Sequence, residues 1–98
     1  MPRKVDSQYV WMDGEVVDAD NAHVSFFAHC IHYGTAVFEG IRCYDAEGGP
    51  AIFRLPEHWE RLRRSARGYY MEYPWTDEQL TEASRDLIRR HDFRECYI

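Results

Sequence analysis

The first half of the chain contains short apolar runs separated by turn residues, a pattern typical of β-strands. Two short β-prone runs, at 9–12 and 15–17, flank Asp13-Gly14. Asp-Gly supplies the two positive-φ positions of a type I′ turn. This pattern therefore predicts a β-hairpin over residues 9–17.

A second pair of strands is predicted further along the chain. Residues 37–44 (VFEGIRCY) form the first strand, 45–50 (DAEGGP) the turn and 51–54 the returning strand. Gly40 inside the first strand indicates a bulge or a close backbone approach by something else. The preceding segment, 26–33, is apolar but interrupted by two histidines, and its pattern leaves open a helical turn or an extended segment.

The second half of the chain has helical periodicity. Pro56 begins the first helix, at a position where its missing N–H costs nothing. Pro74 ends that pattern, and Thr76 with Gln79 predicts a capping box for the second helix. The two apolar stripes consist of Trp59, Leu62, Ala66, Tyr69 and Tyr70, and of Leu80, Ala83, Leu87 and Ile88.

Strands followed by helices and a last extended segment, 94–98, predict an α+β domain. In it, two amphipathic helices pack on an antiparallel sheet. The domain is expected over 9–98, after a flexible polar leader at 1–8. Because the chain ends in an apolar strand, we expect it to be a domain cut short.

Composition narrows the class of protein. A chain of 98 residues, 45% hydrophobic and 30% charged, fits one folded domain rather than a disordered segment. A net charge of −5 argues against a nucleic-acid partner. No apolar run reaches the roughly 20 residues of a membrane span. Three widely spaced cysteines and the lack of a secretory signal predict reduced thiols in a cytoplasmic protein.

The basic residues are almost all arginine. Of the 12, only Lys4 is a lysine. Chemistry that needs an amine from this chain therefore has one candidate, in the predicted leader.

A metal site is the first functional hypothesis, at His29-Cys30-Ile31-His32 with His23 upstream. Zinc sites have recognisable ligand spacings such as paired Cys-x-x-Cys, which this segment lacks. We therefore expect no metal, and histidines that form hydrogen bonds near the surface.

Arginines are concentrated on the first helix. Arg63, Arg64 and Arg67 are predicted on a solvated face, with Glu57–Arg61 and Glu60–Arg64 as i,i+4 pairs.

Arg61 differs in placement, because it lies beside the apolar stripe together with His58 and Ser65. An arginine in such a place can enter a cleft and bind a phosphate with two N–H groups.

The segment 33–42 (YGTAVFEGIR) is the best local candidate for a site. It lacks the Gly-Lys-Ser/Thr of a P-loop. As a strand, it would place Phe38, Gly40 and Arg42 on one face, with Glu39 and Ile41 on the other. A ring, a bare backbone and a cation on one face can line a pocket.

Residues 32–44 (HYGTAVFEGIRCY) resemble the N-terminal signature of branched-chain amino acid aminotransferases. These are fold-type IV enzymes that use pyridoxal 5′-phosphate (PLP). Flanking motifs agree, at 11–15 (WMDGE), 52–54 (IFR) and 96–98 (CYI), together with the pairs Glu57-His58, Arg61-Leu62 and Ser65-Ala66. The resemblance covers 9–98 and implies the small N-terminal domain of such an enzyme, a homodimer or a multiple of dimers.

The resemblance also implies roles for five residues. Arg61 would bind the cofactor phosphate. Phe38 and Gly40 would line the apolar substrate pocket. Tyr33 would reach that pocket from a neighbouring subunit, and Tyr97 would lie near the substrate.

The implied reaction transfers the amino group of leucine, isoleucine or valine to 2-oxoglutarate, with PLP as the electron sink. In this family the lysine that holds the cofactor lies beyond the equivalent of residue 98. We therefore expect no catalytic residue in this chain, a solvated Lys4, and no activity from the chain alone. Two alternatives are a stand-alone interaction or regulatory domain, and the N-terminal domain of a D-amino acid transaminase or aminodeoxychorismate lyase.

Overall fold

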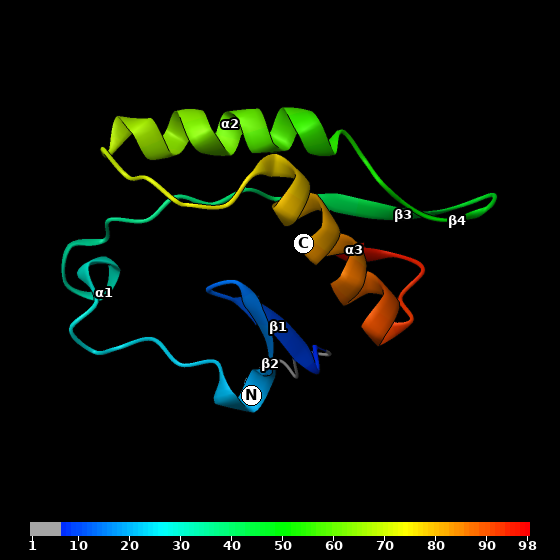
Figure 1. Ribbon diagram of the computed structural model, residues 1–98, viewed down its shortest axis with the longest axis horizontal. Coiled ribbons are helices and arrows are strands. Elements are labelled where there is room, and N and C mark those ends of the chain that lie inside the picture. The colour runs from blue at the N-terminus through cyan, green and yellow to red at the C-terminus, as the bar shows by residue number, and fades with distance from the viewer. Residues whose placement is uncertain (1–6) are drawn as a thin grey trace.

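The computed structural model describes residues 7–98, so Lys4 and most of the predicted leader lie outside the described residues. The elements in chain order are β1 (Tyr9–Met12), β2 (Glu15–Asp18), η1 (Ala19–Asn21), α1 (His29–Tyr33), β3 (Arg42–Ala46), β4 (Gly49–Ile52), α2 (Leu55–Gly68), α3 (Asp77–His91) and β5 (Cys96–Tyr97) (Figure 1). The α+β class is confirmed. Within residues 7–98, no helix has the length and apolar character of a membrane span.

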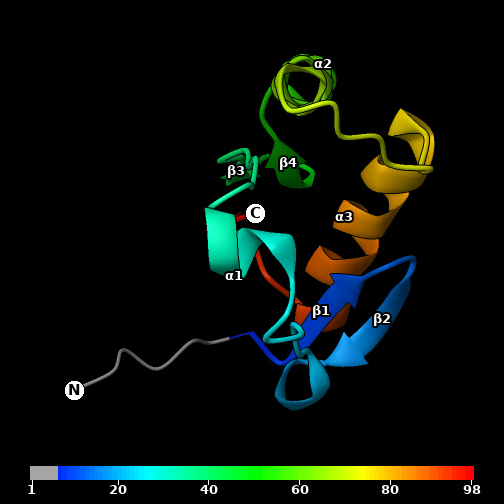
Figure 2. The same cartoon turned by 90° about the vertical axis from the view of Figure 1, so that its left-hand side faces the viewer.

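The antiparallel pairing expected from the sequence is confirmed, and the strands are divided between two sheets. β1 and β2 form one hairpin, and β4, β3 and β5 form a three-stranded antiparallel sheet in that order. β1 packs against α3, which separates the hairpin from α2 (Figures 1 and 2). The hairpin therefore covers a helix and does not extend the other sheet.

The first hairpin has the predicted turn. Met12 pairs with Glu15, which leaves only Asp13 and Gly14 in the turn. Their φ angles of 53° and 95° are both positive, as a type I′ turn requires. Trp11 then packs edge to face with Trp75 at 5.1 Å between ring centroids, and this contact joins the hairpin to the start of α3.

β3, predicted over residues 37–44, begins later than predicted. Residues 37–40 belong to no strand, and only Ile41 of the preceding stretch pairs its backbone, with Ile98. The prediction is wrong there because no described strand lies beside 37–40. The alternation it assumed is nevertheless present: Ile41 and Cys43 are buried while Phe38, Arg42 and Tyr44 are exposed. The turn that follows is also shorter than predicted, since Ala46 pairs directly with Gly49.

The segment at 26–33, whose pattern left two interpretations open, contains the five-residue helix α1. α1 ends at Gly34, whose φ of 67° is left-handed. Long connections hold it at the end of the molecule far from β4 (Figure 1). Phe26, Phe27 and Tyr33 stay largely exposed there.

The two long helices begin as predicted. Pro56 lies in the first turn of α2, and Thr76 and Gln79 form the capping box of α3. The core is made by Ile41, Leu55 and Trp59, with Ile52, Leu62, Leu80 and Ile98 packed around them. Tyr69 and Tyr70 are exposed, contrary to the predicted stripe, because α2 ends at Gly68 and the chain turns away.

Candidate functional site

A buried carboxylate lies at the centre of a cluster of charged and polar side chains. Glu39, in the extended segment before β3, has a side chain only 6% exposed. His58 and Arg61 approach it from one turn of α2. The distance from His58 Nδ1 to Glu39 Oε1 is 2.6 Å. Arg61 donates from Nε to Oε2 at 2.9 Å and from Nη2 to Oε1 at 2.8 Å.

The cluster holds Glu39 in its charged form. The Arg61 hydrogen bonds lower the pKa of Glu39 most, burial raises it, and the His58 hydrogen bond lowers it further, so that the net pKa is below the ordinary value. An ionised carboxylate accepts hydrogen bonds only, and His58 Nδ1 is therefore the donor in the contact. The same pairing raises the pKa of Arg61.

Arg61 uses only one edge of its guanidinium in this contact. Nε and Nη2 are bound to Glu39, and no residue of 7–98 forms a hydrogen bond with Nη1. The side chain is 62% exposed. The guanidinium is rigid and planar, so its second edge remains available to bind a phosphate or carboxylate with two N–H groups.

The predicted place of Arg61 beside His58 is confirmed, but its predicted partner is wrong. Glu57 contacts Arg54 at 4.0 Å, and Arg61 pairs with Glu39. A buried carboxylate needs a charged partner more than an exposed glutamate does, because it has lost most of its hydration.

The other arginines of α2 fall into two groups, exposed and partly buried. Arg64 and Arg67 are exposed as predicted, and Arg64 pairs with Glu60 at 3.2 Å. The prediction for Arg63 is wrong. Its guanidinium donates to Asp77 at 2.6 Å and lies 4.8 Å from the ring centroid of Tyr73, since α2 and the start of α3 come together there.

Gly40 and Tyr97 lie in direct contact, so of the two interpretations left open at Gly40, a bulge or a close approach, the structure shows a close approach. A Cβ atom added to Gly40 would lie 2.5 Å from Tyr97 Oη and 3.2 Å from the ring. Tyr97 reaches this position because β5 pairs with β3, with Tyr97 opposite Arg42. The lack of a side chain at Gly40 is what admits the Tyr97 ring.

Replacing Gly40 with alanine is expected to displace the Tyr97 ring and to lower the free energy of unfolding by about 1 kcal/mol. This is the lower end of overpacking costs, because Tyr97 is 65% exposed and can move. Urea unfolding of Gly40→Ala, with and without Tyr97→Ala, measures the coupling. Tyr97→Ala should remove the cost, whereas Gly68→Ala, which meets nothing within 4 Å, should not be destabilising. An equal cost in both backgrounds would contradict the contact.

Phe38 and Tyr33 are not joined to this cluster. Their exposed fractions are 82% and 74%. Tyr33 packs on His29 within α1, at 4.5 Å between ring centroids. Within residues 7–98, no hydrogen bond or aromatic pair links either ring to Arg61 or Tyr97. Both are apolar surfaces that the described chain leaves uncovered.

The sequence assigned no role to Glu39, and named His58 only as a neighbour of Arg61. The available signal was a charged residue at an inward position of an alternating segment, two residues before the buried Ile41. The histidines of α1 form no such cluster: His29 contacts Thr35 Oγ1 at 3.2 Å. Residues 7–98 contain no group of three side chains placed to hold a metal ion.

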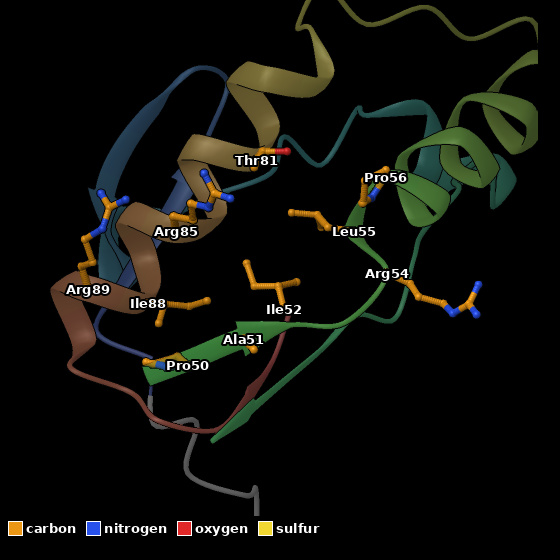
Figure 3. Close-up of a pocket in the computed structure, with 10 residues that line it drawn as sticks. All are labelled: Pro50, Ala51, Ile52, Arg54, Leu55, Pro56, Thr81, Arg85, Ile88 and Arg89. Carbon is orange, nitrogen blue, oxygen red and sulfur yellow. The ribbon is translucent and has the colours of Figure 1, made fainter. Parts of the chain in front are cut away.

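A separate hollow lies between the start of α2 and α3. Figure 3 shows Ile52, Leu55 and Ile88 pointing into it, while Arg54 points away. Neither Arg61 nor Gly40 lines it. This hollow is therefore separate from the Glu39–Arg61 cluster.

The residues of the cluster lie in a segment whose sequence matches a known protein family. The model of the class IV aminotransferases matches residues 36–98, which include Glu39, Gly40, Arg61 and Tyr97. This chain belongs to the class IV aminotransferases.

Its relatives include branched-chain enzymes. A branched-chain-amino-acid aminotransferase of Salmonella typhimurium is 46% identical over 92 residues, which are 94% of this chain and 30% of that protein. The structure of the T.th. branched-chain amino acid aminotransferase complexed with N-(5′-phosphopyridoxyl)-L-glutamate has a TM-score of 0.92 and 45% identity. It covers 96% of this chain and 32% of that one. The Escherichia coli enzyme has a TM-score of 0.89 and 44% identity over 93% of this chain and 31% of that one. The chain thus spans about a third of these relatives.

Proposed function

We propose that this chain forms the N-terminal domain of a cytoplasmic branched-chain amino acid aminotransferase. The observation that supports this most directly is Arg61, whose guanidinium is fixed by Glu39 on one edge and open on the other. It lies in a domain similar to a branched-chain enzyme that was complexed with a phosphopyridoxyl compound.

The residues present fit one end of PLP. A guanidinium with a free edge suits a phosphate, which it can bind with two charge-assisted hydrogen bonds. Arg61 would hold that phosphate. PLP, when bound, would supply the electron sink for removal of the Cα proton of an amino acid.

The substrate side would be formed by the remaining residues of the proposal. Phe38 and Gly40 would line an apolar pocket suited to the side chains of leucine, isoleucine and valine, and Tyr97 would border it. Tyr33 would cover this pocket from a second copy of the protein. The exposed rings of Phe26, Phe27 and Tyr33, in and just before α1, support such an interface, because exposed apolar surface marks interaction sites.

The chain contributes binding groups and not the reacting amine. Its only lysine, Lys4, lies outside the described residues and outside every motif of the resemblance. We therefore propose that these 98 residues alone do not transaminate.

An activity assay tests this proposal. The chain and the product of the whole reading frame that contains it are each incubated with PLP, L-leucine and 2-oxoglutarate, and glutamate formation is followed. Glutamate is expected only from the whole product, and Arg61→Ala should weaken its retention of PLP on dialysis.

Three outcomes would contradict the proposal. Leucine turnover by the chain alone would overturn the division of roles. A preference of the whole product for D-alanine or aminodeoxychorismate would indicate another enzyme of this fold type. A reading frame that ends at Ile98 would favour an interaction or regulatory domain.

A further inference from the structure

We propose that Glu39 is a positioning residue that aims Arg61 at the cofactor phosphate, with His58 holding Glu39 in place. The inference rests on the proposed function, since it assigns to Arg61 the phosphate of PLP. It adds a role for a carboxylate to which the proposed function assigns no contact with cofactor or substrate.

The burial of Glu39 is the first step of the argument. A carboxylate that is 6% exposed has exchanged its hydration for protein donors, and it persists there only if those donors satisfy it. His58, itself 18% exposed, binds Oε1, and Arg61 binds both oxygens. Because Glu39 and His58 are largely buried while Arg61 is exposed, the carboxylate is the fixed partner and the arginine the movable one.

The shape of the guanidinium is the second step. Arg61 is long and 62% exposed, so without a partner its side chain would sample many rotamers. Binding Nε and Nη2 to one carboxylate fixes the plane of the group and hence the direction of its other edge. A phosphate then meets donors that are already oriented, and less conformational freedom is lost on binding.

The Glu39–Arg61 contact can also act against phosphate binding, and this opposite effect makes the inference testable. A carboxylate beside Arg61 also reduces the positive charge that a phosphate experiences. If that effect dominated, removing the charge of Glu39 would strengthen phosphate binding. If Glu39 positions Arg61, removing the charge of Glu39 weakens phosphate binding instead.

The experiment compares two ligands that differ only in phosphate. Pyridoxamine 5′-phosphate and pyridoxamine both lack an aldehyde, so neither can react with Lys4. Each is titrated into the 98-residue chain by NMR, with the Arg61 Nε–Hε signal as a direct reporter. The wild-type chain should bind pyridoxamine 5′-phosphate more tightly than pyridoxamine, and Glu39→Gln should reduce that preference about tenfold, the effect of one well-oriented charged hydrogen bond.

Matched variants separate positioning from general effects. Glu60→Gln removes the same charge from the exposed pair with Arg64 and should leave the preference unchanged. His58→Gln keeps the Glu39–Arg61 pair but loosens it, and should give a smaller loss. In an Arg61→Gln background, Glu39→Gln should have no further effect. The Arg61 Nε–Hε signal should lose its hydrogen-bonded shift in Glu39→Gln and keep it in Glu60→Gln.

The outcomes are distinguishable. Unchanged or tighter binding of pyridoxamine 5′-phosphate by Glu39→Gln would overturn the positioning role and leave the proposed function intact. A wild-type chain that binds both ligands equally would remove the phosphate role of Arg61 and this inference with it. If Glu39→Gln does not fold, an unchanged preference in His58→Gln overturns the inference.

Discussion

Replacing Trp59 with alanine is expected to lower the free energy of unfolding by about 3–5 kcal/mol, the cost of truncating a buried tryptophan. Trp59 is 6% exposed and forms the core with Ile41 and Leu55. Its indole Nε1 also donates to Thr81 Oγ1 at 3.0 Å, which links α2 to α3. Since native domains are stable by only about 5–15 kcal/mol in total, this is a large share of the stability. Urea unfolding followed by far-ultraviolet circular dichroism measures the change.

Two variants test whether the position matters rather than the residue type. Tyr70→Ala truncates an aromatic that is 97% exposed just beyond the same helix, and should change stability by less than about 0.5 kcal/mol. Trp59→Phe keeps a ring in the core but loses the bond to Thr81, and should fall between the two. A loss below about 1 kcal/mol for Trp59→Ala would contradict a core centred on this residue.

The elements that could be predicted from the sequence are those fixed by neighbouring residues. Asp13-Gly14 supplies its own positive φ angles, Thr76 and Gln79 cap the helix that they begin, and Pro56 starts α2. Each signal acts within a few residues of the chain, so its physical cause is visible in the pattern.

The elements that could not be predicted depend on contacts between distant segments. The start of β3 is set by which strand lies beside it, and Ile41 meets Ile98 across the sheet. The separation into two sheets depends on β1 packing against α3. Periodicity gives which face of an element is apolar but not which partner covers that face.

The candidate site shows the same division. The place of Arg61 beside the apolar stripe follows from helical periodicity, because Leu62 and Ala66 face inward and Arg61 lies to one side. Its pairing with Glu39 joins residues 22 positions apart and required the structure. By sequence spacing alone, Glu57 is the expected partner of Arg61. The burial of the Glu39 carboxylate decides in favour of Glu39.

Replacing Arg61 with glutamine is expected to move the acid loss of stability to higher pH. In the wild-type chain the pKa of Glu39 is lowered, chiefly by Arg61. A lowered folded pKa means that the ionised carboxylate stabilises the fold above its unfolded pKa of about 4.3. That contribution is lost as the pH falls through the lower folded value. In Arg61→Gln the largest lowering interaction is weakened while burial still raises the pKa, so the loss begins at higher pH.

Two measurements check this expectation: unfolding by urea between about pH 3 and pH 7, a range that spans the carboxyl titration, and titration of the Glu39 carboxyl carbon by NMR. Arg64→Gln is the matched control, because its partner Glu60 is exposed. This substitution should leave the loss of stability at low pH unchanged. His58 still binds Glu39 in both variants, so the shift should be partial, and adding His58→Gln should enlarge it. Identical acid limbs for the wild-type and Arg61→Gln chains would show that Arg61 does not hold the charge of Glu39. The geometry of the cluster would then have no energetic consequence for folding.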